Sequence, residues 1–377
     1  GRDIREAQKA GEGYMAKGYT YSYDMLGEAA RTDHDAQRYY NSYSDAIDSI
    51  ARHCSGDVRK SPGISVKLSA LLARYEYGNK DRVMKELLPR AKRLVHKAAA
   101  ANMGFNIDAE EQDRLDLSMD VIEALLSDPD LAGWNGFGVV VQAYGKRASF
   151  LLDWLYGLAE KYDRRIMVRL VKGAYWDAEI KRAQVMGLDG FPVFTRKACS
   201  DVSFLSCSTK LLNMTDRIYP QFATHNAHSV SAILELARVR GEANYEFQRL
   251  HGMGESLHSQ VMKESGVPCR IYAPVGPHRE LLAYLVRRLL ENGANSSFVN
   301  QIVDDEITPE MIAKDPIDSV KEMGDNISSK SIVHPFKIFG ENRRNSKGWD
   351  LTDPVTIEAI DKGRDAYKEH HWKGGPL

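Results

Sequence analysis

The sequence predicts an α/β protein whose strands and helices alternate to form a (βα)8 barrel. Eight short apolar segments, most of them separated by helix-like sequence, recur through residues 63–275. Alternation of this kind indicates a parallel sheet, and eight units in roughly 240 residues are typical of a closed barrel with its active site at the carboxyl ends of the strands. The expected strands are Ile64–Leu68, Phe105–Asp108, Phe137–Gln142, Ile166–Val171, Phe191–Phe194, Gln221–His225, Tyr245–Gln248 and Arg270–Tyr272.

The chain divides into three parts. Residues 1–60 carry helical spacing without strand alternation, for example at Asp24–Glu28 and Ala36–Ile50, and we expect an N-terminal helical arm packed on the barrel. Residues 61–303 hold the barrel units. Beyond them the apolar rhythm fades, so we expect residues 304–377 to be a linker or tail toward a further domain. The clearest barrel helices are predicted at Lys80–Ala101, Arg114–Ser127, Arg147–Tyr162, Ser229–Arg240 and His278–Asn292.

The composition is that of a globular protein large enough to bury a substantial core. The 377 residues are 43% hydrophobic and 27% charged, and the net charge of −1 offers no bulk attraction for nucleic acid or an anionic membrane. No apolar run approaches the ~18–20 residues that span a bilayer. Four cysteines without a CxxC pair are expected to be reduced thiols in a cytoplasmic protein. They are Cys54, Cys199, Cys207 and Cys269.

Strand parity identifies three charged residues that point into the barrel. Alternate residues of a barrel strand face the lumen and the outer helices. Because the aliphatic neighbours of Lys67, Asp108 and Arg169 occupy the outward positions of their strands, these three side chains should face inward. Burying them is costly unless they pair with one another or with a ligand. A ligand site and a purely stabilising ion network both fit this pattern.

The helix after the last strand carries a second polar cluster. Tyr284, Arg287, Arg288 and Glu291 lie at positions i, i+3, i+4 and i+7, so they share one helix face. Two adjacent arginines can each direct a fork at a carboxylate or phosphate. A solvated charged stripe is the alternative, but the position beside the barrel mouth favours ligand binding.

Other signals are weaker. His225 and His228 lack an obvious third ligand, so a metal site has little support. The glycines of His251–Glu255 permit either close approach to a ligand or a tight turn. Lys172–Trp176 could present backbone N–H groups to a ligand beside the aromatic rings of Tyr175 and Trp176. No GxGxxG, P-loop, HExxH or GxSxG motif occurs, which removes the usual support for Rossmann, P-loop, zincin and serine-hydrolase chemistry.

Eight motifs, in order along the chain, resemble the proline dehydrogenase domain of the proline utilization A family. The resemblance runs from about residue 20 to 303. It implies a distorted TIM-type (βα)8 barrel that binds FAD without a Rossmann fold. The motifs are Val66–Ala70, Asn106–Glu111, Gln142–Tyr144, Arg169–Asp177, Phe222–His228, Leu250–Glu255, Tyr272–Gly276 and Tyr284–Asn292.

The resemblance also implies a role for each site residue. Arg287 and Arg288 would clamp the carboxylate of proline, Glu28 would pair with Arg287 to close the site, and Arg169 would lie near the flavin N5. The implied catalytic set is Glu28, Lys67, Arg169, Tyr272, Arg287 and Arg288. The implied substrate-binding set is Lys67, Tyr175, Leu250, Tyr272, Tyr284, Arg287 and Arg288. The implied cofactor set, with no metal, is Asp108, Gln142, Arg169, Val171, Gly173, Ala174, Tyr175, Trp176, Thr224, His225, Asn226 and Glu291.

The reaction implied by the resemblance is the oxidation of L-proline to 1-pyrroline-5-carboxylate, the first step of proline catabolism to glutamate. A hydride would pass from proline C5 to flavin N5, and the electrons would go on to a membrane quinone. Transient association with the inner face of the membrane is therefore implied. Full-length family members continue into an aldehyde dehydrogenase domain, and some begin with a DNA-binding domain; we expect neither within these residues.

Two other interpretations remain open at this point. One is a Schiff-base barrel aldolase that uses Lys67 or Lys172. The other is a catalytically silent barrel used for binding or assembly.

Overall fold

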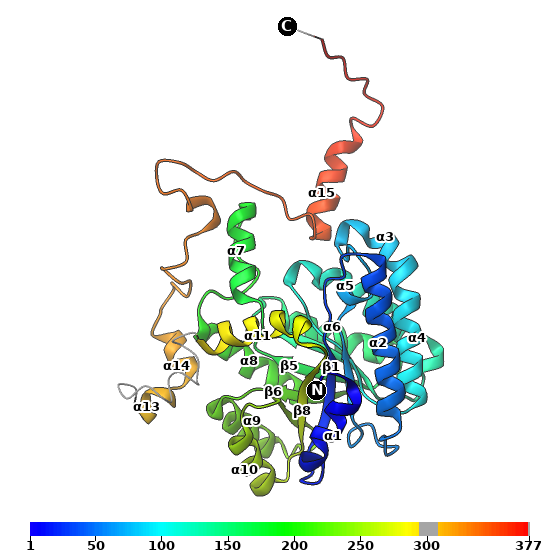
Figure 1. The fold of residues 1–377 in the computed structure, drawn as a ribbon. Helices are drawn as coiled ribbons and strands as arrows, with labels where there is room; N and C mark the ends of the chain where they lie inside the picture. Colours follow the sequence, from blue (N-terminus) through cyan, green and yellow to red (C-terminus); the bar gives the residue numbers. More distant parts are fainter. Residues whose placement is uncertain (294–307, 376–377) are drawn as a thin grey trace.

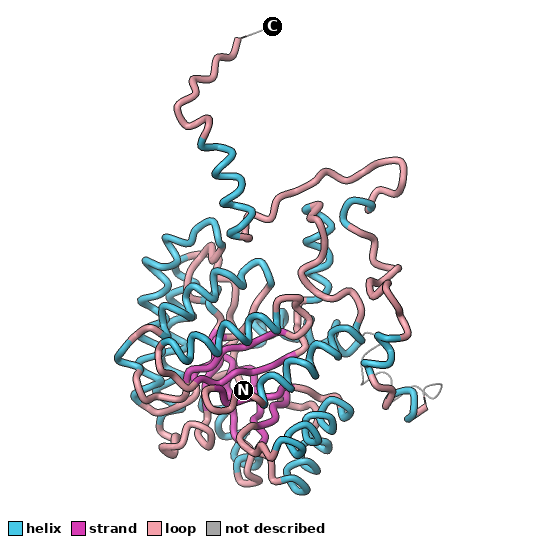
Figure 2. The backbone as a smooth tube through the Cα atoms, turned by 180° about the vertical axis from the view of Figure 1, so that it is seen from behind, coloured by secondary structure: helices cyan, strands magenta, loops and turns pink. Residues whose placement is uncertain are grey.

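Eight parallel strands form a closed barrel in the computed structural model, which describes residues 1–293 and 308–375. The strands pair in chain order, and β8 closes the barrel on β1. Figure 2 shows them at the centre of the molecule with helices around them. The strands are β1 Thr20–Met25, β2 Gly63–Val66, β3 Phe105–Ile107, β4 Phe137–Gln142, β5 Ile166–Val171, β6 Ile218–Ala223, β7 Glu246–Leu250 and β8 Cys269–Val275.

Most of the helices form the outer layer of the barrel, whereas the one at Pro354–Asp365 projects away from it (Figure 1). The one that follows β1 begins at a capping box, in which Thr32 and Asp35 satisfy each other's backbone N–H groups, and it buries the face that includes Tyr43 and Ile47. The main helices are α1 Ile4–Met15, α2 Asp33–Ala51, α4 Leu88–Ala100, α5 Leu115–Leu126, α6 Ala148–Lys161, α7 Trp176–Met186, α8 Lys197–Leu212, α9 Ala227–Arg240, α10 Glu255–Ser265 and α11 His278–Gly293. The others are α3 Lys80–Arg82, α13 Pro309–Ile312, α14 Pro316–Lys321 and α15 Pro354–Asp365.

The barrel class is confirmed, but two of the expected elements are wrong. The segment around Asp24, expected to be helical, belongs to β1, which pairs with both β2 and β8. Phe191–Phe194 is not a barrel strand; it forms a single antiparallel bridge between Val193 and Gly145. Pro192 has no N–H to give to a sheet, which disfavours a strand at this position. Because β1 was missed and a strand was wrongly predicted at Phe191–Phe194, the expected number of strands was still eight.

The remaining strand and helix assignments are confirmed to within a few residues. Each of the five helices expected in the barrel is present, although the one predicted at Lys80–Ala101 contains a π-helical turn at Val83–Leu87. The four cysteines are free. Among the described residues, no helix is long and apolar enough to cross a membrane.

Polar side chains fill much of the barrel interior. In the lower part, Arg270 Nε donates to Glu246 Oε1 at 2.8 Å, and Gln221 Nε2 donates to the same oxygen at 3.0 Å. All three side chains are buried. Inward-facing residues at the carboxyl ends of the strands form a second polar layer above this one, and it is there that the candidate site lies.

Candidate functional site

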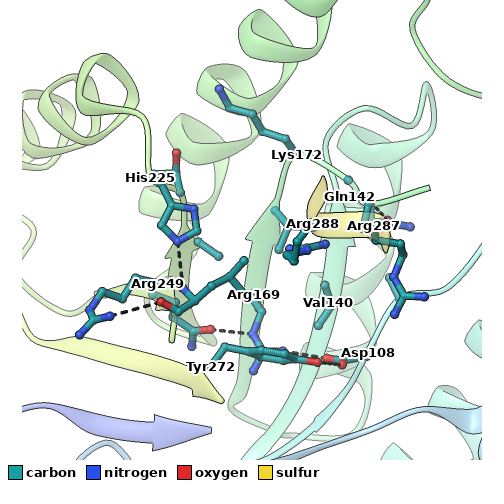
Figure 3. Close-up of a pocket in the computed structure, with 18 of the residues that line it drawn as sticks. Asp108, Val140, Gln142, Arg169, Lys172, His225, Arg249, Tyr272, Arg287 and Arg288 are labelled. Atoms are coloured by element: carbon teal, nitrogen blue, oxygen red, sulfur yellow. Dashed lines mark hydrogen bonds and ion pairs between the residues drawn. The ribbon is translucent and has the colours of Figure 1, made fainter. Parts of the chain in front are cut away.

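A cavity of about 300 Å³ lies at the carboxyl ends of the barrel strands (Figure 3). The structure brings all but three of the predicted site residues to its wall. Those that line it are Lys67, Asp108, Gln142, Arg169, Val171, Gly173, Ala174, Tyr175, Thr224, His225, Asn226, Leu250, Tyr272, Tyr284, Arg287 and Arg288. Glu28 and Trp176 do not line it, and the side chain of Glu291 lies outside the described residues.

Arg169 is the centre of a hydrogen-bonded network on the cavity floor. Its Nη1 donates to Asp108 Oδ1 at 2.7 Å, and its Nε donates to Gln248 Oε1 at 2.6 Å. Tyr272 donates its hydroxyl to the other oxygen of Asp108 at 2.7 Å, and the guanidinium of Arg169 lies 5.1 Å from the centre of the Tyr272 ring. Figure 3 shows Asp108, Arg169 and Tyr272 together.

Two serines complete the contacts of Arg169. Its Nη2 donates to Ser22 Oγ at 3.1 Å and to Ser65 Oγ at 3.0 Å, and the two hydroxyls are 3.0 Å apart. Because Nε, Nη1 and Nη2 all have partners, the buried guanidinium is held in one orientation. A fixed positive charge at the floor can stabilise negative charge that develops on a bound molecule.

Lys67 lies beside this network between two carboxylates. Its Nζ is 2.6 Å from Asp24 Oδ1 and 3.5 Å from Asp108 Oδ2. Burial alone would lower the pKa of the ammonium group, but the charges of Asp24 and Asp108 outweigh this and raise the pKa well above its ordinary value. Lys67 is therefore a charged group at neutral pH.

Arg287 joins α11 to the loop after β1. Its two terminal nitrogens donate to the two oxygens of Glu28 at 2.5 and 2.9 Å, and its guanidinium lies 5.1 Å from the centre of the Tyr175 ring. Burial raises the pKa of Glu28, but the hydrogen bonds from Arg287 and the charge of Lys67 lower it more. Glu28 lines a second cavity, of about 230 Å³, that shares Lys67 and Arg287 with the first. This ion pair thus stands where the two cavities meet.

Arg288, the next residue of α11, faces the first cavity, and its guanidinium is 5.4 Å from the centre of the Tyr284 ring. The two arginines therefore present separate guanidinium groups to one space, as the helix spacing predicts. Glu291 belongs to the same helix, but its side chain is outside the described residues. Trp176 lies behind the cavity wall, where its Nε1 donates to the backbone oxygen of Phe194 at 2.8 Å.

The end of β6 supplies a rigid polar corner. Asn226 caps α9 by accepting from the backbone N–H of Ser229 at 2.9 Å, and His225 Nε2 accepts from the N–H of Leu250 at 2.9 Å. Burial, followed by the charges of His258 and Arg288, lowers the pKa of His225 to about 3. The imidazole is therefore neutral at physiological pH, and it positions the backbone of Leu250.

Gln142 and Gly173 form the wall between β4 and β5. Gln142 Nε2 donates to the backbone oxygen of Glu110 at 2.8 Å, and Gln142 Oε1 accepts from the N–H of Ala174 at 3.4 Å. Gly173 has a φ of +141°, and a Cβ there would lie 2.5 Å from the ring of Tyr144. The chain therefore needs glycine at this position to pass so close to the aromatic ring.

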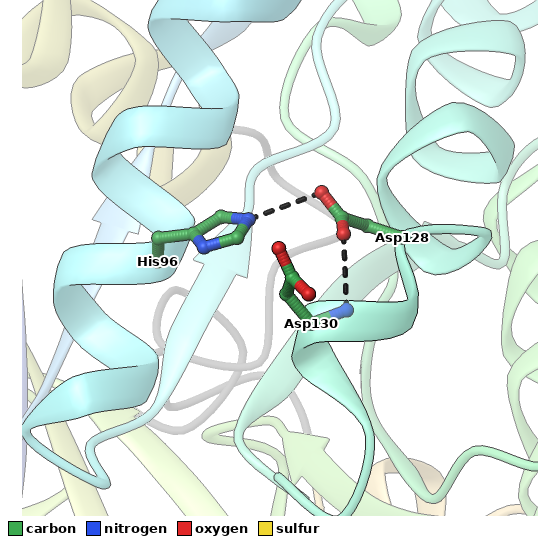
Figure 4. Close-up of side chains that lie close together, drawn as sticks. All are labelled: His96, Asp128 and Asp130. Atoms are coloured by element: carbon green, nitrogen blue, oxygen red, sulfur yellow. Dashed lines mark hydrogen bonds and ion pairs between the residues drawn. The ribbon is translucent and has the colours of Figure 1, made fainter.

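A geometric cluster of possible metal ligands lies elsewhere, at His96, Asp128 and Asp130 (Figure 4). Its central carboxylate is already engaged. Asp128 lies 3.0 Å from His96 Nε2 and 3.2 Å from Lys92 Nζ, and it accepts from the backbone N–H of Asp130 at 3.1 Å. An ammonium group beside the ligands opposes cation binding. This cluster is explained by its own ion pairs and by the short helix that Asp128 caps.

Several residues of the site were not among those predicted from the sequence. Asp24 and Ser22 belong to the strand that was missed, and Gln248 and Ser65 are uncharged partners of Arg169. Lys197 lines the cavity from the start of α8, a helix that was not predicted. The signal for Asp24 was present in the sequence, because Thr20–Met25 alternates inward polar residues with outward tyrosines.

The sequence matches the family model described as "Proline dehydrogenase" over residues 7–301. It is 49% identical to "Bifunctional protein PutA" of Klebsiella aerogenes, over 100% of this chain and 30% of that protein. It is 27% identical to "Proline dehydrogenase" of Deinococcus radiodurans, over 80% of this chain and 87% of that protein. The chain thus spans less than a third of the length of the bifunctional relative.

Solved structures agree in fold. A crystal structure described as bifunctional proline utilization A superposes with a TM-score of 0.91 at 48% identity, covering 100% of this chain and 38% of the other. Proline utilization A from Bdellovibrio bacteriovorus, described as inactivated by N-propargylglycine, superposes with a TM-score of 0.87 at 27% identity. That match covers 98% of this chain and 39% of the other.

Proposed function

Because this chain belongs to the proline dehydrogenase family, we propose that it oxidises L-proline to 1-pyrroline-5-carboxylate with FAD as its cofactor. One observation carries the proposal. The fixed cation Arg169 and the charged Lys67 face the paired arginines Arg287 and Arg288 around a single cavity. Such a site suits a small carboxylate bound beside a cofactor that gains negative charge.

The residues around the cavity fit FAD. Lys172 and Lys197, which both pair with Asp201, supply positive charge suited to a diphosphate, and Val140 and Val171 supply apolar surface suited to a planar ring system. We propose the cofactor-binding set given above, including Trp176 and Glu291, as the residues that hold it.

The paired arginines would bind the carboxylate of proline. Arg287 is already oriented by Glu28 and Arg288 lies against Tyr284, so each guanidinium is positioned before the substrate arrives. Pre-positioned groups cost less entropy when they bind a ligand. Lys67 and Tyr272 would shape the floor beneath the ring, with Leu250 at its side.

The reaction removes a hydride from proline C5 and a proton from the proline nitrogen, which leaves the C=N double bond of the product. FAD supplies the acceptor for the two electrons of the hydride. This chain's residues would orient C5 and stabilise charge. The positive Arg169, fixed by its partners, is the group suited to electrostatic stabilisation on the floor. The nitrogen must also lose its proton for the C=N double bond to form.

The physiological role proposed is the first step of proline catabolism to glutamate, with electrons passed to a membrane quinone during transient membrane association. An aldehyde dehydrogenase domain is the proposed partner, because such an enzyme would consume the product after its hydrolysis. The bifunctional relatives extend well beyond the matched region, which supports the presence of a further domain. We propose the division 1–60, 61–303 and 304–377 with the first boundary moved to before β1, because Thr20–Met25 is a strand of the barrel.

The Schiff-base alternative is disfavoured by the state of both lysines. A nucleophilic lysine must be neutral, and enzymes lower its pKa for that purpose. Lys67 instead has a raised pKa between two carboxylates, and Lys172 Nζ is 2.5 Å from Asp201 Oδ1. A silent barrel would have no need to hold seven lysine and arginine side chains around one cavity.

Anaerobic reduction of the flavin tests the proposal. The protein reconstituted with FAD should show a flavin absorption band that bleaches when L-proline is added and persists with D-proline, whose carboxylate is displaced relative to the ring. Protein that stays colourless and inactive after FAD is added would refute the proposed function.

The acceptor is tested separately. After bleaching, a soluble short-chain quinone added under argon should restore the flavin band within the mixing time. Slow or absent recovery would show that the physiological acceptor is of another class, while leaving the oxidation of proline intact.

A further inference from the structure

Residues 327–350, which we call the strap, are not a free linker but run along α7 and the loop that joins it to α8. The backbone N–H of Ser329 donates to Thr195 Oγ1 at 2.9 Å, and Gln184 Nε2 donates to the backbone oxygen of Val333 at 2.8 Å. In both contacts a side chain of the barrel forms a hydrogen bond with the backbone of the strap. These contacts therefore depend on where the strap's backbone lies and not on which side chains the strap carries.

The second half of the strap returns to the end of α7. Asn345 Nδ2 donates to the backbone oxygen of Gln184 at 3.1 Å, and the N–H of Gly348 donates to the oxygen of Gly187 at 3.0 Å. A Cβ at Gly348 would lie 1.8 Å from the backbone oxygen of Met186. The two backbones approach so closely that only glycine fits, so the strap is seated in one register.

In the first half of the strap, the side chain of Ile332 enters the helical layer of the barrel. Ile332 packs against a small apolar core that is separate from the main core of the barrel. The next residue, Val333, is exposed, whereas the ring of His334 lies 6.5 Å from that of Phe191, so Val333 is the neighbour that does not contribute to this contact. The small core consists of Tyr144, Ile180 and Val193, with Trp176, Phe191 and Ile332 against it.

This small core lies directly behind the cavity wall. The ring of Tyr144 presses on Gly173, which lines the cavity. The N–H of Tyr144 donates to the backbone oxygen of Lys172 at 2.7 Å, and its own backbone oxygen accepts from Phe194 at 2.9 Å. The oxygen of Phe194 in turn accepts from Trp176. Tyr144 therefore connects the core that Ile332 completes to two residues of the wall.

We infer that the strap is a positioning element of the cofactor site: by completing the small core it holds the Lys172–Trp176 segment in the conformation that FAD requires. The inference rests on the proposed function. Since coupling between two binding events is reciprocal, docking of the strap strengthens FAD binding and FAD strengthens docking of the strap.

Titration of the full-chain apoprotein with FAD tests the coupling through flavin fluorescence. Ile332→Asp places a charge in the small core and should raise the Kd for FAD about tenfold, within the usual range of coupling between sites. Val333→Ala, a change of the adjacent exposed residue, should leave the Kd within about twofold of the parent value.

A backbone variant covers the case in which Ile332→Asp unfolds. Gly348→Ala obstructs the seat of the strap without altering the barrel, and it should weaken FAD binding in the same direction. Gly363→Ala is the control, because a Cβ at that position in α15 meets no atom within 4 Å. In the parent protein, FAD should slow proteolytic cleavage within residues 327–350, a readout that does not depend on turnover.

The possible outcomes separate the inference from the function. A parent protein that binds FAD, together with folded Ile332→Asp and Gly348→Ala variants that bind it equally tightly, overturns the inference alone. Cleavage of the strap at the same rate with and without FAD also overturns it. A parent protein that takes up no FAD overturns the proposed function, and the inference with it.

Discussion

Lys67 and Asp24 form a 2.6 Å ion pair that joins β2 to β1 inside the barrel. The side chains are 6% and 1% exposed, respectively. Lys97 and Asp48 form a pair of the same 2.6 Å length on the surface, where the side chains are 33% and 58% exposed. The two pairs have the same N–O distance but differ in exposure to solvent, so together they compare the cost of removing one partner in the two environments.

Asp24→Asn should lower the free energy of unfolding by about 3–5 kcal/mol, because it leaves the buried ammonium of Lys67 without its nearest counter-charge. Asp48→Asn should cost less than about 1 kcal/mol, as exposed pairs do. Urea denaturation of the apoprotein measures both values. Equal losses for the two variants would mean that the buried pair does not contribute more than the exposed one.

The fold was predictable where apolar alternation is strong and was missed where polar residues face the lumen. Thr20–Met25 contains only one fully apolar residue, Met25, and its outward positions include two tyrosines. Its residues therefore do not alternate clearly between polar and apolar, which is the pattern that predicts a strand. Its inward residues are polar because they accept hydrogen bonds inside the barrel: Ser22 accepts from Arg169, and Asp24 accepts from Lys67. The strand predicted at Phe191–Phe194 is wrong for the opposite reason. It is apolar because it packs in the small core behind the cavity, not because it belongs to the sheet.

The candidate site could be predicted from the sequence to about the same extent as the fold. Parity placed Lys67, Asp108 and Arg169 in the lumen without reference to any relative, and the structure brings them together. Strand parity alone could not identify Gln248 as a site residue. Burying an uncharged side chain costs less than burying a charge, so an inward glutamine does not by itself indicate a partner or a ligand. The contacts of residues 327–350 were also beyond sequence patterns, because several of them are made by backbone atoms.

Glu28→Gln should raise the KM for proline about 10- to 100-fold while changing kcat less, because it removes the charge that orients Arg287 for a carboxylate, a change of the size expected for a desolvated ion pair. Steady-state kinetics with FAD-loaded protein measure both constants. Asp116→Asn, which weakens the exposed pair with Arg147, is the control and should leave both unchanged. An unaltered KM in Glu28→Gln would remove Glu28 from the proposed catalytic set.

His225 should make the apoprotein less stable as the pH falls below 6.5. Its pKa is about 3 in the folded chain against an ordinary 6.5, so between these values the unfolded state binds more protons than the folded state. Stability present above pH 6.5 is therefore lost as the pH falls toward 3, by about 1 kcal/mol per pH unit. Denaturation at pH 7, 6 and 5 should show this slope.

His225→Gln keeps an acceptor for the N–H of Leu250 and should reduce the slope of stability between pH 7 and 5. Part of the slope should remain, because burial also lowers the pKa of His258. His34→Gln, a substitution of an exposed histidine, should reproduce the parent profile. A His225→Gln profile as steep as that of the parent would show that His225 does not account for the loss.

Gly173→Ala should weaken FAD binding and lower the stability of the apoprotein by about 1–3 kcal/mol, the usual cost of forcing a side chain into a disfavoured backbone region. The φ of +141° strains any L-residue, and the new Cβ would meet the Tyr144 ring at 2.5 Å. Gly157→Ala is the matched control. It lies within α6, where a Cβ meets no atom within 4 Å, and alanine there should stabilise the helix by about 0.5–1 kcal/mol. Opposite signs for the two substitutions would show that Gly173 is required by the backbone and the ring behind it; stabilisation by both would contradict the close approach at the cavity wall.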